Sequence, residues 1–166
     1  MRRWRRWLLE AGVALLALYA LQEWLTREVV RGPLPTLQGE LLDGRPLEHW
    51  RAALAGRSHV VYVWATWCGV CKAMQANVDA ASRDRAVLSV AFRSGEDAQV
   101  RRQLASRGLD WATLNDPEGA IGGQLGVSAV PLLLFVDGQG VVRAVSRGYT
   151  TEAGIRARLW WIDRTG

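Results

Sequence analysis

The sequence is short of cysteine, lysine and histidine. Its 166 residues include two cysteines, two histidines and a single lysine, Lys72. Two cysteines are too few for a small protein held together by several disulfides. The sequence has no internal repeat and no low-complexity tract, and 49% hydrophobic with 22% charged residues is ordinary for a globular chain. The length therefore predicts one folded domain with a short appendage, and excludes wholesale disorder.

The basic charge is concentrated at the N-terminus. A net charge of +5 and a pI of about 10.0 are at first sight typical of nucleic-acid-binding proteins. However, residues 1–31 carry six arginines against three glutamates, while the other 135 residues carry 15 basic and 13 acidic groups. We therefore expect no nucleic-acid partner, and read the preference for arginine over lysine as a composition bias.

The N-terminal segment has the pattern of a membrane anchor. Four arginines within residues 1–6 precede an apolar window from Trp7 to Leu25, which holds only Glu10, Gln22 and Glu23 as acidic or amide residues. As a helix this window would span roughly 28 Å, close to the hydrocarbon thickness of a bilayer. The positive-inside rule places the arginines in the cytoplasm and the rest of the chain across the membrane.

The alternative for this segment is a cleaved signal peptide. The sequence from Leu18 to Gln22 matches a cleavage site poorly, and four arginines leading into the run do not suit a buried helix of a soluble protein. We therefore expect residues 1–31 to be a cytoplasmic tip and a retained single transmembrane helix. Residues 32–166 then form a domain on the far side of the membrane, which the resemblance described below places in the periplasm, at a bacterial inner membrane.

Helical and strand patterns alternate through the domain. Thr36–Leu47 holds two short apolar runs around Asp43-Gly44, which predicts a β-hairpin. Strands are predicted at 60–64, 86–92, 111–114, 132–136 and 141–145, and helices at 47–55, 69–83, 96–107, 121–125 and 150–162. This order predicts an α/β fold with a mixed sheet flanked by helices and antiparallel strands at one edge.

Both cysteines lie in one motif, Cys68-Gly69-Val70-Cys71, between a predicted buried strand and a predicted helix. At the N-terminus of a helix, free N–H groups and the helix dipole stabilise a thiolate. Cys71 follows one turn later, close enough to form a disulfide with Cys68. The motif predicts thiol–disulfide exchange, in which Cys68 attacks and Cys71 resolves the mixed disulfide. The pair is itself the redox centre, so no diffusible cofactor is expected.

Other uses of two cysteines fit less well. A zinc site needs further ligands, and His49 and His59 have no paired spacing; a c-type haem needs a histidine where Lys72 stands. A purely structural disulfide closing so short a loop adds little stability. The alternative from another class of function is a copper-binding or copper-delivery module, in which the same two thiols would bind the metal.

The segment 63–71, Val-Trp-Ala-Thr-Trp-Cys-Gly-Val-Cys, resembles the active-site segment of the thioredoxin superfamily, and specifically its membrane-tethered TlpA/DsbE-like branch. Segments 115–119, 125–127, 130–131 and 135–140 recur in the same order in that branch. Segments 64–72, 92–97 and 158–161 resemble its suppressor-for-copper-sensitivity D group. The resemblance implies a thioredoxin fold and a protein-disulfide oxidoreductase.

The resemblance also implies further roles. Pro131 would be a cis proline facing the dithiol, the backbone at Val130 would pair with the substrate chain, and Trp67 would shield one side of the disulfide. The partners would be cysteine-containing periplasmic proteins and a DsbD-like membrane electron donor. Gly69-Val70 lacks a histidine that would favour an oxidant, which is consistent with a reductase, in copper tolerance or in cytochrome c maturation.

One position departs from the superfamily pattern. Many thioredoxins carry a buried acid six residues before the first cysteine, which assists proton transfer from the resolving thiol. This chain has Tyr62 there, and Glu48 and His59 are weak candidates for a replacement base.

Overall fold

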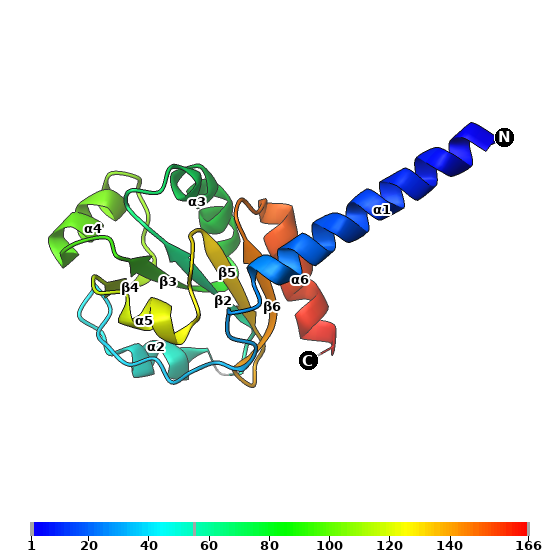
Figure 1. The fold of residues 1–166 in the computed structure, drawn as a ribbon. Helices are drawn as coiled ribbons and strands as arrows, with labels where there is room; N and C mark the ends of the chain where they lie inside the picture. Colours follow the sequence, from blue (N-terminus) through cyan, green and yellow to red (C-terminus); the bar gives the residue numbers. More distant parts are fainter. Residues whose placement is uncertain (1, 55, 166) are drawn as a thin grey trace.

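The computed structural model describes residues 2–54 and 56–165, which form a six-stranded mixed sheet flanked by helices, with a long N-terminal helix projecting from it (Figure 1). The helices are α1 (Arg2–Leu25), α2 (Leu47–Ala53), α3 (Gly69–Ser82), α4 (Asp97–Ala105), α5 (Ala120–Gln124) and α6 (Glu152–Thr165). The strands are β1 (Gly32–Pro33), β2 (His59–Trp64), β3 (Ala86–Phe92), β4 (Ala112–Asp116), β5 (Leu132–Val136) and β6 (Val141–Arg147). The predicted mixed α/β architecture is confirmed.

Strand β2 lies inside the sheet, whose order is β1-β6-β5-β2-β3-β4. It pairs in parallel with β3, to which α3 connects it, and antiparallel with β5. All six of its residues are buried, which explains its continuous run of β-branched and aromatic side chains. The sheet thus holds the end of β2 rigidly, and the cysteine motif follows that end directly.

The two faces of the sheet carry separate apolar clusters. Tyr62 and Trp64 of β2 pack in one cluster with residues of α3, α4 and α6. Val61 and Val63 point to the other face, where they pack with Leu41, Leu125 and other residues of the N-terminal segment and the α5 region. Alternating side chains of one strand therefore anchor both layers of the domain.

The predicted hairpin over Thr36–Leu47 is wrong as a pair of strands. It is reduced to a turn at Asp43-Gly44 and a single antiparallel bridge between Glu40 and Pro46. Proline has no N–H to donate to a ladder. The N–H of Leu42 is donated instead to the carbonyl oxygen of Thr113 in β4. The segment therefore follows the edge of the sheet rather than folding onto itself.

The segment before Gly32 packs on the domain. Val29 is buried in the second cluster, and the N–H of Val30 bonds to the carbonyl oxygen of Leu125. Gly32 and Pro33, expected as part of a linker, form the short strand β1 on β6. Residues 29–33 thus tie the N-terminal helix to the sheet.

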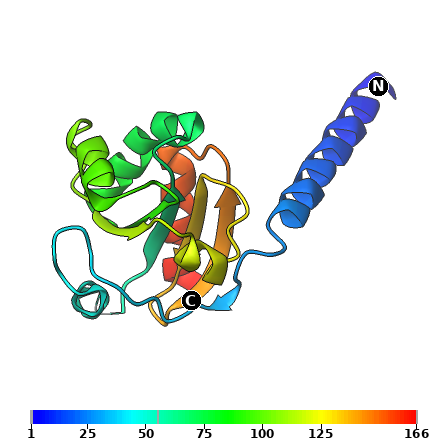
Figure 2. The ribbon, with the colours of Figure 1, turned by 60° about the vertical axis from the view of Figure 1, so that its left-hand side comes forward.

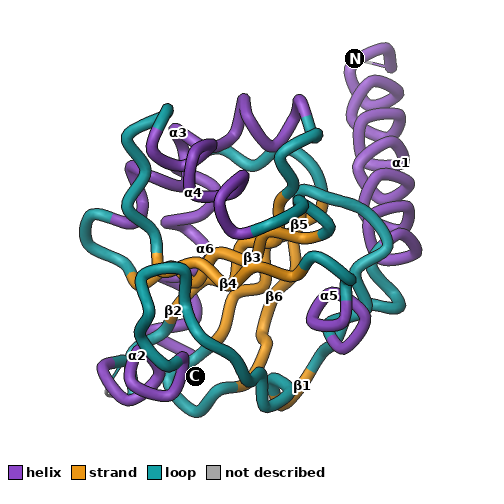
Figure 3. The backbone as a smooth tube through the Cα atoms, turned by 90° about the vertical axis from the view of Figure 1, so that its left-hand side faces the viewer, coloured by secondary structure: helices purple, strands orange, loops and turns teal. Residues whose placement is uncertain are grey.

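Helix α1 stands away from the domain in two further views (Figures 2 and 3), with Trp4, Trp7 and Trp24 exposed along it. It covers the window in which a membrane-spanning helix is expected. Within residues 2–54 and 56–165, no helix combines the length and the apolarity needed to cross a membrane.

Candidate redox site

The cysteine motif joins the end of β2 to the start of α3. Cys68 is the N-cap residue of α3, and the N–H of Cys71 donates to its Sγ over 3.0 Å. The two residues form a disulfide, with their Cα atoms 5.2 Å apart. The predicted pairing is confirmed, and the Cys68 sulfur occupies the N-terminal end of a 14-residue helix, where a thiolate is stabilised.

The two sulfur-bearing residues differ in access. Cys68 is 7% exposed, whereas Cys71 is fully buried. The flanking Trp67 and Val70 are exposed by 63% and 50%. An incoming partner can therefore reach Cys68 between two apolar side chains, while Cys71 is shielded by the domain.

Val130 and Pro131 lie beside the disulfide. Their peptide bond is cis, as the resemblance implies. The Sγ atom of Cys68 lies 3.9 Å from the carbonyl oxygen of Val130. Residues 62 positions apart in the sequence are thus brought together because β5, which begins at Leu132, pairs with β2.

The loop after β3, which lies in the segment 92–97 quoted for the family resemblance, supports Trp67. The indole N–H of Trp67 donates to the carbonyl oxygen of Arg93 over 3.0 Å, and the N–H of Thr66 donates to Ser94 Oγ over 3.0 Å. Arg93 itself has φ +46°, in the left-handed region. A cavity of about 310 Å³ opens beside this contact, lined by Thr66, Trp67, Arg93, Ser94, Gly95, Gln99 and Gln103. The resemblance marked segment 92–97 but gave it no role at the site, since the loop meets Trp67 only through tertiary contact.

Tyr62 takes the place of the acid found in many thioredoxins. Its hydroxyl donates to the carbonyl oxygen of Cys71 over 3.2 Å. Burial raises the pKa of Tyr62 far above its ordinary value. The phenol therefore stays protonated and cannot accept the proton of Cys71.

The other candidate bases lie away from the cysteines. His59 begins β2, at the opposite end of the strand from Cys68, and its ring packs edge-on against Trp50. Burial lowers the pKa of His59 to about 4. Glu48 lies exposed on α2, which precedes the same end of β2. Neither residue is a replacement base for Cys71.

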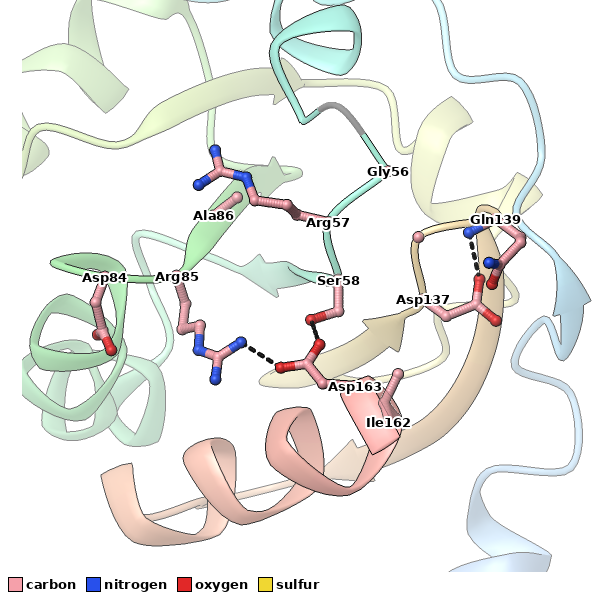
Figure 4. A pocket seen from close by; sticks show the side chains of 11 residues that line it. Gly56, Arg57, Ser58, Asp84, Arg85, Ala86, Asp137, Gln139, Ile162 and Asp163 are labelled. Carbon is pink, nitrogen blue, oxygen red and sulfur yellow. Dashed lines mark hydrogen bonds and ion pairs between the residues drawn. The ribbon is translucent and has the colours of Figure 1, made fainter. Parts of the chain in front are cut away.

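A cavity of about 510 Å³ lies at that opposite end of the sheet (Figure 4). In it the carboxylate of Asp163 accepts hydrogen bonds from Ser58 and Arg85, over 2.5 and 2.6 Å. These contacts hold the pKa of Asp163 below its usual range, with the Ser58 hydrogen bond contributing most. They tie the end of α6 to the starts of β2 and β3, so the cavity is a structural junction rather than part of the redox site.

Among the residues that the structure describes, no group of three or more histidine, cysteine, aspartate or glutamate side chains is arranged to hold a metal ion. Met74, one turn from the cysteines, has its sulfur occupied as an acceptor of the Thr150 N–H over 3.0 Å.

Known proteins resemble the chain over most of its length. The redoxin family model matches residues 32–159. A thioredoxin-like protein of Haemophilus influenzae is 27% identical, over 84% of this chain and 80% of the relative. The thiol:disulfide interchange protein DsbE of Escherichia coli K12 is 26% identical, over 94% of this chain and 90% of the relative.

Solved structures share the fold. A secreted Mycobacterium tuberculosis disulfide oxidoreductase homologous to DsbE superposes with a TM-score of 0.64 at 20% identity. The superposition covers 75% of this chain and 95% of that one. With the disulfide at the start of α3, the family match and the shared fold, the chain belongs to the redoxin family and is a DsbE/TlpA-like protein-disulfide oxidoreductase of the thioredoxin superfamily.

Proposed function

We propose that this protein reduces disulfides of periplasmic proteins through Cys68 and Cys71, while held at the inner membrane by its N-terminal helix. The observation that carries the proposal is the asymmetry of the two sulfurs. Cys68 lies at a helix N-terminus, beside the Val130 carbonyl and with a small exposed surface, whereas Cys71 is fully buried one turn away. Such an arrangement gives one attacking and one resolving sulfur.

The reduced protein would act in two exchange steps. The Cys68 thiolate attacks one sulfur of the substrate disulfide, and the other substrate sulfur leaves as a thiolate. Cys71 then loses its proton and attacks Cys68 Sγ, which forms the Cys68–Cys71 disulfide and releases the remaining substrate sulfur. Two electrons pass to the substrate, and protons from solvent neutralise the released thiolates.

The residues around Cys68 suit an extended polypeptide. We infer that the backbone at Val130 pairs with the substrate next to its cysteine and that Pro131 holds this backbone in place. The exposed indole of Trp67 would cover the substrate from the other side, since its N–H is already satisfied by Arg93. Trp67, Val130 and Pro131 are therefore proposed as substrate-contacting residues.

The oxidised pair must be reduced again, and we propose that a DsbD-like membrane protein supplies the electrons. Membrane attachment is supported by the exposed tryptophans of α1 and by the arginines of its first turns. Fractionation of cells expressing the full chain tests this: the protein should stay with membranes after alkaline carbonate washing. Release by carbonate would mean that α1 does not anchor it.

The direction of electron flow is tested by the reduction potential of the Cys68–Cys71 pair, measured by equilibration with glutathione and dithiothreitol buffers. A potential near about −270 mV, the thioredoxin range, is expected of a reductant. A potential near about −120 mV would mean an oxidant and would contradict the proposed direction.

The same titration addresses the copper-binding alternative. Absence of a reversible two-electron transition would overturn the oxidoreductase proposal, and copper binding by the reduced protein would then be the leading function. Deletion of the gene separates the physiological roles. Copper sensitivity is expected for copper tolerance, and loss of c-type cytochromes for cytochrome maturation.

A further inference from the structure

Gln75 is a polar side chain in an apolar place. It is 2% exposed, and neither its amide nitrogen nor its amide oxygen has a hydrogen-bond partner among the described residues. Burial of an amide without hydrogen bonds destabilises a fold, so such groups are rare and call for an explanation. Helix α3 begins at the redox motif, and Gln75 is the one buried polar side chain in it.

Gln75 follows Cys71 by one helical turn. The buried residues of α3 are Cys71, Met74, Gln75, Val78 and Ala81. Residues four apart on a helix face each other, with Cβ atoms about 5–6 Å apart, and helical side chains lean toward the preceding turn. The long Gln75 side chain can therefore bring its amide to the Cys71 sulfur.

The other groups near Cys71 are occupied. Tyr62 donates its hydroxyl to the backbone carbonyl of Cys71, and the Met74 sulfur accepts the N–H of Thr150. Arg107, which follows α4, donates to the carbonyl oxygen of Lys72 in the first turn of α3. Arg156 of α6 donates to the carbonyl oxygen of Ala80 and to the carboxylates of Asp84 and Glu152. The titratable or charged groups at this helix are Tyr62 of β2, Lys72 and Asp79 of α3, Arg107 after α4, and Arg156 of α6 with its partner Glu152.

The oxidation state explains why the amide lacks a partner. In the disulfide the Cys71 sulfur carries no proton and no charge, and is a weak acceptor. Reduction converts it to a thiol and then, in the second exchange step, to a thiolate, which accepts hydrogen bonds strongly. The partner for Gln75 would therefore form only in the reduced protein.

We propose that in the reduced protein the Gln75 amide donates a hydrogen bond to the Cys71 sulfur, and so positions and stabilises the thiolate that attacks Cys68. The inference rests on the proposed function, since it concerns its second exchange step. There the Cys71 proton passes to solvent, the Cys71–Cys68 bond forms, and the bond from Cys68 to the partner breaks. The partner sulfur leaves with the electron pair. Gln75 is a positioning residue, because it transfers neither proton nor electron.

The test uses the reduced full chain in detergent and the disulfide reagent 5,5′-dithiobis(2-nitrobenzoate), followed by stopped-flow absorbance. Attack by Cys68 releases one thionitrobenzoate, and attack by Cys71 on the mixed disulfide releases the second. In Gln75→Met, which keeps the length and removes the amide, the second phase should slow at least about tenfold at neutral pH. Its pH midpoint should move upward, because an unstabilised thiolate forms at higher pH.

Two controls separate positioning from packing. The first phase of Gln75→Met should stay within about twofold of the wild type, since Cys68 keeps its helix N-terminus. The exposed glutamine variant Gln38→Met, away from the redox site, should leave both phases unchanged. Oxidised Gln75→Met should be at least as stable as the wild type, because an unpartnered amide has been removed. If it does not fold, Gln75→Leu takes its place.

An unchanged second phase, or equal slowing of both phases, would overturn the role of Gln75. The proposed function fails separately: a wild-type protein that completes both phases but reduces no protein disulfide would contradict that function and leave the result for Gln75 intact.

Discussion

At the scale of single residues, the chemistry depends on the unequal environments of two identical side chains. Cys68 lies at the N-cap of α3, where the backbone N–H of Cys71 points at its sulfur. Cys71 has no exposed surface. A partner can therefore meet only the first sulfur, and the second acts within the protein.

This asymmetry predicts different outcomes for the two serine variants. Cys71→Ser should accumulate mixed disulfides between Cys68 and substrate proteins, because the resolving thiol is missing. Cys68→Ser should form few, since Cys71 is buried. The measurement is non-reducing electrophoresis of the two variants expressed in cells, with the double variant as the control. Equal adducts from both variants would contradict the assignment of Cys68 as the attacking residue.

His59 predicts a loss of stability in mild acid. Burial lowers its pKa from 6.5 to about 4, so below pH 6.5 the unfolded chain binds a proton that the folded protein does not. The unfolding free energy should therefore fall as the pH drops from about 6.5 to about 4, by on the order of 2–3 kcal/mol. Urea unfolding at several pH values measures this.

The matched variants for that experiment are His59→Gln and His49→Gln, since His49 is the exposed histidine. The first should flatten the pH dependence in this window, and the second should leave it as in the wild type. A wild-type slope in His59→Gln would assign the acid sensitivity to other groups.

At the scale of elements, the backbone at Glu28 in the N-terminal segment packs closely against the backbone at Gly126, just after α5. Gly126 has φ +70°, and a Cβ built there would lie 1.9 Å from the carbonyl oxygen of Glu28. Gly108 has a similar φ of +63° but nothing within 4 Å of the same position. Alanine at Gly108 therefore tests backbone strain alone, and alanine at Gly126 tests the same strain together with a steric clash.

Gly108→Ala should cost about 1–2 kcal/mol, the strain of a left-handed residue with a side chain. Gly126→Ala should cost about 1–3 kcal/mol more, because the chain at Glu28 must move to make room. Chemical unfolding of the two variants tests the difference. Equal losses would mean that the segment at Glu28 shifts freely and is not held against Gly126.

At the scale of the whole molecule, the N-terminal segment is both appendage and part of the core. The family match begins at residue 32, yet Val29 lies buried and Val30 donates to Leu125. A chain starting at Gly32 should therefore be about 2–4 kcal/mol less stable than one starting at Thr26, since it loses a buried valine and a hydrogen bond.

Thermal or urea unfolding of these two truncated chains measures the contribution of residues 26–31. Val29→Ala in the longer chain should give an intermediate stability, because the backbone hydrogen bond of Val30 remains. If the two truncated chains proved equally stable, Val29 would contribute nothing, and the domain boundary at residue 32 would also be its energetic boundary.

The sequence alone determined most of the elements and the pair of cysteines that forms the disulfide. Local patterns were sufficient for β3 and β5, whose bounds are as predicted, because buried strands read as continuous apolar runs between turn residues. The cysteine spacing and the helix after it were enough to predict the disulfide, since both are local features.

Only the tertiary structure decided which distant groups surround the sulfurs. The predicted hairpin failed because Leu42 found its partner in β4, which no local pattern reveals. The Arg93 loop contacts Trp67, and the buried Gln75 amide has no hydrogen-bond partner among the described residues, for the same reason: both depend on how the layers pack. A glutamine at a core position one turn after Cys71 was the one sequence signal for that site. Periodicity marks such a position as buried, and only the packed fold can show that none of the described residues bonds to its amide.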